Sequence, residues 1–355
     1  MWKVYAVILL WKCATTLIGI VSAQGEFHKE LIYVQAIWRH GDRAPKQLPY
    51  PNDNYNETAW PRGWGQVTNV RIFQKLYQIS LPSIFFEIDV DLVSSKSDRA
   101  IVSGLAMLRG FFPAIGQEEW LQNEQWQPLL QVATTDAMLK PTSFNCLMYN
   151  VKSEKENEVL FKNISKQYAS FFDFLANVTG YKKMNFKKAT SLYNIQREID
   201  HNMTQPSWVY NVWPQFNNET TISIISSLKR IRRISQFNSA EKARLRGGLL
   251  MKDWIDRARN VSLGLSHDGT LLALMYALGI GNDLLVPYAS CAIMEIYKTL
   301  NSHTIMFFYK NGTVVHQLLL PGCSSYDNCT IAQVEKAVSR RSVRSLQQLN
   351  KANFF

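Results

Sequence analysis

The sequence predicts an α/β protein with a mainly parallel central sheet flanked by helices and a smaller, mostly helical cap domain. In the first and last thirds of the chain, apolar runs of strand length alternate with helical segments, whereas strand signals fade between about residues 136 and 250. Alternation of strand, turn and helix is typical of a parallel sheet covered by helices. With 355 residues, 46% of them hydrophobic, the chain is long enough for one large domain with insertions or for two domains.

Five short apolar or alternating runs are expected to be strands. They cover residues 31–38, 87–93, 262–265, 292–297 and 304–309. The last run reaches Lys310-Asn311-Gly312, a sequence typical of a hairpin turn.

Helical spacing of apolar residues predicts helices over 67–80, 98–112 and 270–278. Aromatic- and lysine-rich helical patterns dominate the middle of the chain. Residues 46–66 are rich in proline, asparagine and tryptophan, and we expect them to form an active-site loop.

Four regions follow from these patterns. They are a signal peptide (1–23), an α/β core (24–135 and 250–335), a helical cap insertion (136–249) and a basic C-terminal tail (336–355). Lys3 precedes two apolar runs, and Ala23 ends a small-residue cleavage site. Lys12 interrupts the apolar run, so an uncleaved anchor is the alternative. No later segment reaches the roughly 18 to 20 apolar residues of a membrane span.

Eight Asn-x-Ser/Thr sequons agree with secretion. They begin at Asn56, Asn163, Asn177, Asn202, Asn218, Asn260, Asn311 and Asn328. After the signal, the cysteines are Cys146, Cys291, Cys323 and Cys329, an even number that suggests disulfides in an oxidising compartment. Cys323 and Cys329 flank a short polar loop that a disulfide could close. No second Cys or His pair has zinc-ligand spacing, so no metal site is expected.

The net charge of +11 invites a nucleic-acid interpretation, which the pattern does not favour. The basic cluster Lys229-Arg230-x-Arg232-Arg233 interleaves with apolar residues at helical spacing, as a solvated helix face does. A second cluster lies in the tail at 340–344. The net charge is instead expected to attract anionic substrates or surfaces.

The segment Arg39-His40-Gly41-Asp42-Arg43-Ala44-Pro45 carries the strongest chemical signal. It places an imidazole between two guanidinium groups directly after the first predicted strand. Fixed positive charge suits the equatorial oxygens of a phosphoryl group, and imidazole is a nucleophile that can attack its phosphorus.

Around this segment the chain resembles the histidine acid phosphatases, the branch of the histidine phosphatase superfamily that includes secreted prostatic and lysosomal enzymes. The resemblance covers nearly all of the chain after the signal. Its motifs, in family order, are Arg39-His40-Gly41-x-Arg43-x-Pro45, Trp60-Pro61-x-Gly63-x-Gly65-Gln66-x-Thr68, Arg244-Leu245-x-Gly247-Gly248, Ser266-His267-Asp268, Pro287-Tyr288-Ala289-Ser290-Cys291 and Leu320-Pro321-Gly322-Cys323.

The resemblance implies an acid phosphomonoesterase. In the family, the first-motif histidine attacks a phosphomonoester and becomes phosphorylated, and water then releases phosphate. Carried over, His40 is the catalytic nucleophile, Asp268 is the catalytic proton donor, and Arg39, Arg43 and His267 bind the phosphate. The chemistry needs no metal and no other cofactor.

The expected protein is therefore a secreted or lysosome-type acid phosphatase whose partner is a phosphomonoester substrate. Neither a nucleic-acid partner nor a membrane span after the signal is expected. Family members are often dimers, so the resemblance allows a homodimer.

The chain departs from the family pattern at Val93, which stands where the family has a third phosphate-binding arginine. Losing one such donor costs roughly 100- to 1000-fold in rate, by analogy with oxyanion-hole deletions. Lys96 is a candidate replacement for that arginine; the alternative is that Lys96 is a solvated turn residue. Arg99 matches a later family arginine, for which a structural role is expected. The second hypothesis is therefore a secreted pseudophosphatase that binds phosphate or phosphorylated ligands with little turnover.

Two further positions stay open at this stage. Cys146 and Cys291 match family cysteines whose partners are missing here, so they are either free thiols or bonded to each other. His201 falls on a family-like segment, where it either packs in the cap or lines the pocket entrance.

Overall fold

The computed structural model describes residues 29–68, 92–111, 130–132, 137–258, 262–299, 303–312 and 314–351. The predicted signal peptide, nearly all of the helix predicted over 67–80, most of the strand predicted over 87–93 and Asn260 lie outside the described residues.

A seven-stranded sheet forms the centre of the described fold, in the order β3-β2-β6-β1-β7-β8-β9. The strands are β1 (Glu30–Arg39), β2 (Leu92–Ser94), β3 (Leu130–Val132), β6 (Ser262–Ser266), β7 (Cys291–Lys298), β8 (His303–Asn311) and β9 (Val314–Leu318). The strands predicted over 31–38, 262–265, 292–297 and 304–309 are confirmed, and β2 contains the two described residues of the one predicted over 87–93, whereas β3 and β9 were not predicted.

The prediction of a mainly parallel sheet is wrong. The pairs β1–β6, β2–β6 and β2–β3 are parallel, but β1–β7, β7–β8 and β8–β9 are antiparallel. The reason is the length of the connections: a parallel neighbour needs a crossover of a dozen or more residues, and only residues 299–302 separate β7 from β8. The hairpin predicted around Gly312 is confirmed, since β8 pairs with β9 directly across it.

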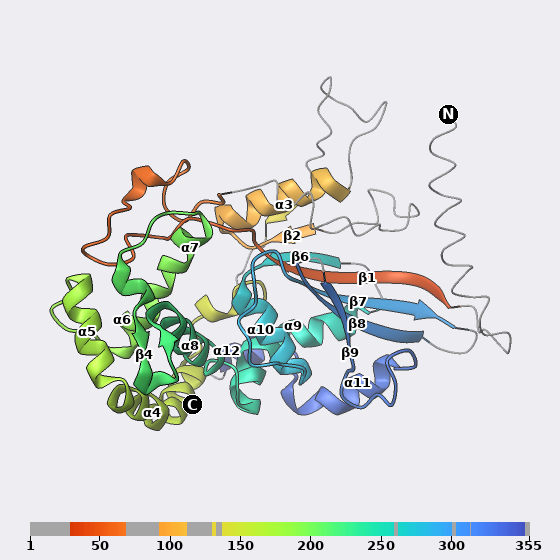
Figure 1. Ribbon diagram of the computed structural model, residues 1–355. Helices are drawn as coiled ribbons and strands as arrows, with labels where there is room; N and C mark the ends of the chain where they lie inside the picture. Colours follow the sequence, from red (N-terminus) through yellow and green to blue (C-terminus); the bar gives the residue numbers. More distant parts are fainter. Residues whose placement is uncertain are drawn as a thin grey trace, which may run out of the picture.

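Helices cover both faces of this sheet (Figure 1). One face packs on α9 (Ala240–Arg257) and α10 (Asp268–Leu278), and the other on α3 (Asp98–Phe111). Successive residues of a strand point to opposite faces, so Ile37 of β1 joins the first core and Trp38 the second. A strand buried on both faces explains why residues 31–38 read as a nearly continuous apolar run.

Gly247 permits the close packing of α9 on α10. A Cβ at this position would lie 1.9 Å from the carbonyl oxygen of Ala273, closer than any two such atoms can approach. Gly247 of the Arg244-Leu245-x-Gly247-Gly248 motif therefore has a packing role between α9 and α10.

A second, mostly helical unit follows in the chain and has its own core. It contains α4 (Leu147–Gln167), α5 (Ala169–Thr179), α6 (Phe186–Ser191), α7 (Ile195–Asp200), α8 (Thr221–Ile234) and the short antiparallel pair β4 (Val212–Trp213) and β5 (Glu219–Thr220). Its core is rich in aromatic side chains, including Phe171 and Phe172, and receives Tyr50 from the loop at 46–66. Helix α9 follows and packs on the sheet again. It begins at Ala240, ten residues before the predicted start of the second core segment at residue 250.

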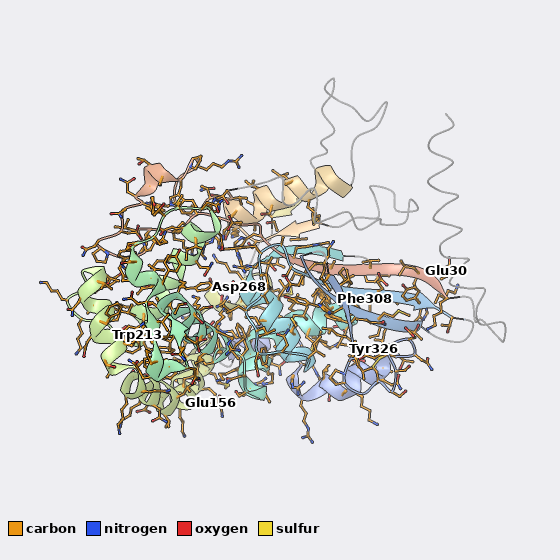
Figure 2. The ribbon with its side chains drawn as sticks, viewed as in Figure 1. Glu30, Glu156, Trp213, Asp268, Phe308 and Tyr326 are labelled. Atoms are coloured by element: carbon orange, nitrogen blue, oxygen red, sulfur yellow. A yellow bond between two sulfur atoms is a disulfide. The ribbon has the colours of Figure 1, made fainter. Side chains whose placement is uncertain are left out.

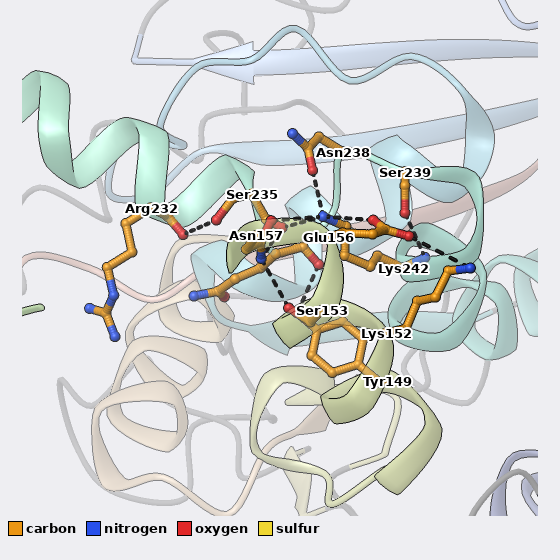
Figure 3. Close-up of polar contacts among 11 residues, drawn as sticks. Tyr149, Lys152, Ser153, Glu156, Asn157, Arg232, Ser235, Asn238, Ser239 and Lys242 are labelled. Atoms are coloured by element: carbon orange, nitrogen blue, oxygen red, sulfur yellow. Dashed lines mark hydrogen bonds and ion pairs between the residues drawn. The ribbon is translucent and has the colours of Figure 1, made fainter. Parts of the chain in front are cut away.

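A buried ammonium group ties α4 and α9 together where α8 ends (Figure 3). The side chain of Lys242 is only 2% exposed. Its Nζ donates to the Ser235 carbonyl oxygen at 2.7 Å, to Asn238 Oδ1 at 2.8 Å and to Asn157 Oδ1 at 3.2 Å, and pairs with Glu156 at 3.1 Å. Since buried charge is stable only when it is paired and hydrogen-bonded, this network fixes the relative position of the helices.

The C-terminal segment packs back on the fold through α11 (Ile331–Val338) and α12 (Leu346–Lys351). Val343 and Leu349 of the predicted basic tail are buried against Leu245 of α9. The disulfide predicted between Cys323 and Cys329 is present.

Cys146 and Cys291 are free thiols, buried in separate hydrophobic clusters. The alternative in which they bond to each other is therefore not realised in the structure.

Single-turn 3-10 helices complete the described structure, at η1 (Glu57–Ala59), η4 (Pro141–Ser143), η5 (Leu192–Asn194), η6 (Ser207–Tyr210), η7 (Pro214–Phe216) and η8 (Ser339–Arg341). None of the described helices has the length and apolar character required to cross a bilayer.

Candidate active site

The candidate site forms where three neighbouring parallel strands end. Strands β2, β6 and β1 lie side by side, and the residue that follows each of them is Ser95, His267 and His40, respectively. The register pairs Arg39 with Ser266, so the two histidines emerge next to each other, with ring centroids 5.3 Å apart. Ligands of open α/β sheets bind at this carboxyl edge.

The tautomer of His40 is set by the backbone. Nδ1 lies 2.7 Å from the carbonyl oxygen of Gly41, which can only accept, so Nδ1 carries the proton. Nε2 therefore carries no proton, and its lone pair accepts a hydrogen bond from Nε of Arg99 at 3.1 Å. This is the protonation state that a nucleophilic imidazole requires.

Arg99 also contacts the second imidazole. Its Nη2 lies 3.3 Å from Nδ1 of His267, and because a guanidinium only donates, Nδ1 accepts. Nε2 of His267 then carries the proton and faces Oγ of Ser95 at 3.0 Å. Arg99, for which a structural role was expected, thus lies between both histidines.

Arg39 and Arg43 come from the same segment as His40 and line the same cavity. The guanidinium of Arg39 stacks on the ring of Tyr288, 3.8 Å from its centroid, and donates to the carbonyl oxygen of Val286. Arg43 donates to the carbonyl oxygen of Ala44 at 2.7 Å. Nε of each arginine is buried and has no acceptor within the described part of the chain. Each guanidinium therefore keeps one N–H donor that the described part of the protein does not satisfy.

Asp268 is the first residue of α10, directly after His267. Its carboxylate forms a two-pronged ion pair with Arg233 of α8, at 2.9 and 3.0 Å. Gly269 makes this approach possible, since a Cβ there would lie 2.5 Å from Nη2 of Arg233. Asp268 lies between the sheet and the helical unit (Figure 2).

These side chains line one cavity of about 720 Å³, which holds all five residues predicted for the site: Arg39, His40, Arg43, His267 and Asp268. Among its described lining residues, nine are basic and two acidic. The basic ones are Arg39, Arg43, Lys46, Arg99, Lys140, Arg197, Lys229, Arg230 and Arg233, and the acidic ones are Asp200 and Asp268. Within the described residues no group of three or more His, Cys, Asp and Glu side chains is placed to hold a metal ion.

Comparison with known proteins identifies relatives of similar sequence and solved structures of similar fold. No family model matches the chain. The prostatic acid phosphatase of Rattus norvegicus is 30% identical over 322 residues, which cover 83% of this chain and 83% of that protein. The lysosomal acid phosphatase of Xenopus laevis is 30% identical over 329 residues, which cover 83% of this chain and 73% of that protein.

The chain belongs to the histidine acid phosphatase family. By family, it is an acid phosphomonoesterase. Solved structures support the fold: the apo form of Hafnia alvei phytase matches with a TM-score of 0.65 at 13% identity, over 90% of this chain and 98% of that one. The phytase of D. castellii matches with a TM-score of 0.60 at 15% identity, over 93% of this chain and 84% of that one.

In this family member burial, together with the positive charge of the cavity, keeps both imidazoles neutral. Burial, followed by the charges of Arg39, His267 and Arg99, holds the pKa of His40 well below its usual value. Burial and the charge of Arg99 lower the pKa of His267 to about 3. The same effects lower the pKa of Arg43 to about 10, through burial and the neighbouring Arg197.

The carboxyl group of Asp268 is ionised in this arrangement. Burial acts to raise its pKa, but the charges of Arg233, Arg39 and Lys229 outweigh that effect and hold the pKa well below the usual value. Proton donation from this carboxyl therefore requires that negative charge enter the cavity.

Other positions singled out by the sequence take different places. Val93 packs partly buried against the core beneath the sheet, and Lys96 is exposed. Nε2 of His201 lies 2.6 Å from Oδ2 of Asp42, and its ring packs on Trp60, so it has the packing role. Sequence reasoning missed that Arg99 and Tyr288 line the cavity. A usable signal for Arg99 was its place in the first turn of the helix that follows Val93.

Proposed function

We propose that this protein hydrolyses phosphomonoesters through a phosphohistidine intermediate on His40. The observation that carries the proposal is the Nε2 lone pair of His40, held in a cavity beside three guanidinium groups. Arg39, Arg43 and Arg99 match the charge that a transferring phosphoryl group spreads over its equatorial oxygens.

In the first step Nε2 of His40 attacks phosphorus, and the bond from phosphorus to the ester oxygen breaks. Asp268 gives its proton to the departing oxygen, which leaves as an alcohol. In the second step water attacks the phosphohistidine, Asp268 takes a proton from that water, and phosphate leaves with Nε2 again free. In both steps the Nε2–H of His267 exchanges its partner Ser95 Oγ for a phosphate oxygen.

The charge of the substrate makes these roles compatible with the ion pair between Asp268 and Arg233. A phosphate dianion next to Asp268 disfavours its carboxylate, since like charges raise a carboxyl pKa. The same dianion attracts the guanidinium of Arg233. An acidic working range follows, because the carboxyl must hold a proton.

Arg99 is a candidate replacement for the family arginine whose place Val93 takes. It comes from the first turn of α3, six residues after Val93, and reaches both imidazoles. We propose that it supplies the third guanidinium of the phosphate site, which favours hydrolysis over the phosphate-binding alternative without turnover.

The test is hydrolysis of an aryl phosphate near pH 5 by wild type, His40→Ala and His303→Ala, the last an exposed histidine of β8 as matched control. We expect His40→Ala to lose turnover and His303→Ala to keep it. Wild type quenched in alkali, where the phosphorus–nitrogen bond is stable, should carry phosphate on histidine. Equal rates for wild type and His40→Ala would overturn the mechanism. If wild type binds phosphate but shows no turnover, the pseudophosphatase hypothesis would replace the proposed hydrolysis.

We also propose a secreted or lysosomal location. The seven sequon asparagines within the described residues are all exposed on the surface: Asn56, Asn163, Asn177, Asn202, Asn218, Asn311 and Asn328. Protein from a secretory host should lose mass on enzymatic removal of N-glycans. An unchanged mass would contradict the proposal.

A further inference from the structure

The cavity brings many like charges together before any anion enters it. The α8 face with Lys229, Arg230 and Arg233, which the sequence predicted to be solvated, lines the cavity instead, because α8 buries its apolar side in the core of the helical unit. Arg39 and Arg197 line the same cavity. Neighbouring cations repel each other more strongly where burial lowers the dielectric constant. A guanidinium on a long, rotatable side chain therefore keeps one orientation here only if other groups hold it.

Tyr288 holds two of these cations through different parts of one side chain. The guanidinium of Arg39 stacks on the face of its ring, 3.8 Å from the centroid. Nε of Arg197 donates to its hydroxyl oxygen at 2.7 Å. The negative face of an aromatic ring attracts a cation, and a hydroxyl oxygen accepts from a charged donor. One side chain therefore attracts two like charges at separate positions.

Arg197 is itself fixed by its own helix, α7. The residue is only 9% exposed. Its Nη1 donates to Oδ1 of Asn194, three residues earlier, while its Nε is bonded to Tyr288. The hydroxyl of Tyr288 therefore has a donor that cannot move freely, and this bond connects the helical unit to the phosphate-binding segment of the sheet.

The backbone next to Tyr288 is held in an uncommon conformation. Ala289 is buried and has a φ of 58°, in the left-handed region that residues other than glycine rarely adopt. Its amide donates to the His40 carbonyl oxygen at 3.4 Å, and the Arg39 amide donates to the Ser290 carbonyl oxygen at 2.9 Å. Such strain persists only where the surrounding contacts enforce it, and it is common at functional sites. The segment that carries Tyr288 is thus fixed against the segment that carries the nucleophile.

We propose that Tyr288 is a positioning residue for phosphoryl transfer, which holds Arg39 in the orientation that binds the scissile phosphate and is anchored by Arg197. The inference rests on the proposed function, since it places the scissile phosphate beside Arg39 and His40. Stacking on a ring fixes a guanidinium without occupying any of its N–H donors, and the buried Nε of Arg39 has no acceptor within the described residues. A carboxylate in the same place would occupy those donors and neutralise the charge that phosphate needs.

The first test compares two variants of Tyr288 in the hydrolysis of 4-nitrophenyl phosphate at pH 5. Tyr288→Leu removes the ring and should lower kcat/KM by about 10- to 100-fold, since a displacement of about 1 Å in a site costs up to about 100-fold. Tyr288→Phe restores the ring without the hydroxyl and should recover kcat/KM to about threefold below wild type.

Tyr297→Leu is the matched control for this comparison. Tyr297 is also half-buried and its hydroxyl donates to Glu295 at 2.6 Å, but it does not line the cavity. This variant should keep the kcat/KM of wild type. An equal loss in Tyr288→Leu and Tyr297→Leu would assign Tyr288 a general packing role and overturn the inference.

A double-mutant cycle shows whether Tyr288 acts through Arg39. It compares Arg39→Gln with the double variant Arg39→Gln/Tyr288→Leu. If the ring serves to hold the guanidinium, its removal should lower kcat/KM no further once that guanidinium is gone. A loss by the same factor with and without Arg39 would overturn the positioning role.

A second cycle tests the anchor and does not require that Tyr288→Leu fold. Arg197→Gln and Tyr288→Phe break the same hydrogen bond, so each should lower kcat/KM by about threefold and the double variant should fall no further. Multiplied losses, or no loss in Tyr288→Phe, would overturn the anchor. If wild type hydrolyses no phosphomonoester, the proposed function itself fails, whereas an unimpaired Tyr288→Leu beside an active wild type overturns only the positioning role.

Discussion

Nε of Arg99 lies 3.1 Å from Nε2 of His40, so a residue of α3 contacts the atom proposed to attack phosphorus. The backbone of the same residue is held as well: Ser103 Oγ donates to the Arg99 carbonyl oxygen at 2.5 Å and accepts from the amide of Gly41 at 3.1 Å. The helix and the nucleophile loop are therefore connected at two points, and the arginine is positioned by its own helix.

Replacement of Arg99 is expected to impair catalysis strongly. Arg99→Gln should lower kcat/KM for an aryl phosphate by roughly 100- to 1000-fold, as the loss of a preorganised donor to a developing charge does. Steady-state kinetics at pH 5 measure this. Lys96→Gln removes an exposed positive charge three residues earlier and should stay near wild type. A loss below about threefold for Arg99→Gln would mean that it is not the replacement for the family arginine.

The role of Asp268 predicts a dependence on the leaving group. Asp268→Asn cannot donate a proton, so hydrolysis of an alkyl phosphate, whose alkoxide leaves poorly, should fall far more than hydrolysis of 4-nitrophenyl phosphate. Comparing kcat for the two substrates in wild type and variant measures the difference. Equal losses for both substrates would assign Asp268 a role other than proton donor.

Arg233 is expected to set the pH range of activity through Asp268. Its charge lowers the pKa of that carboxyl, so Arg233→Gln should raise the pKa and keep the proton donor protonated to higher pH. The alkaline limb of the profile of kcat/KM against pH should then move upward. Arg232→Gln, on the same helix, should leave the limb in place, and a downward shift in Arg233→Gln would contradict the coupling.

A buried carboxyl pair between the loop at 46–66 and α7 predicts greater stability in acid. Burial and the neighbouring Asp53 raise the pKa of Glu198 from 4.5 to about 8. The folded state thus holds a proton that the unfolded state releases between these values, and the stabilisation present below pH 4.5 is lost as the pH rises towards 8. This loss is at most about 1.4 kcal/mol per pH unit.

The measurement is the unfolding free energy of wild type and Glu198→Gln between pH 4.5 and 8. The variant should gain stability relative to wild type as the pH rises, because glutamine has no proton to lose. The exposed Glu154→Gln serves as control. A difference that does not change with pH would show that Glu198 is not protonated in the folded state.

Lys242 is expected to be important for stability and not for the cavity. Lys242→Ala leaves the acceptors on Ser235, Asn157 and Asn238 without their buried donor, which should cost roughly 3 kcal/mol of unfolding free energy. Chemical denaturation measures the loss. Lys155→Ala, an exposed lysine of α4, should change stability little. Similar values for both variants would contradict the importance of the buried network.

Much of the local structure could be predicted from the sequence because its signals are local. The apolar run before Arg39 marks β1, helical spacing marks α3 and α10, and Gly312 marks the hairpin between β8 and β9. The candidate site residues were predicted from the motif around His40 and from the resemblance to the histidine acid phosphatases, which singled out His267 and Asp268. The mixed direction of the sheet was missed because strand pairing depends on connections between elements, not on residues within them.

The sequence by itself determined which residue types follow each strand and therefore which side chains meet at the carboxyl edge of the sheet. Only the tertiary structure decided which cations face the cavity. Helical spacing shows that Lys229, Arg230 and Arg233 share a face, but not whether that face meets water or His267. Likewise, the long side chain of Arg99 reaches the imidazoles because α3 packs on β2 and β6, and such packing brings together residues that no spacing in the sequence connects.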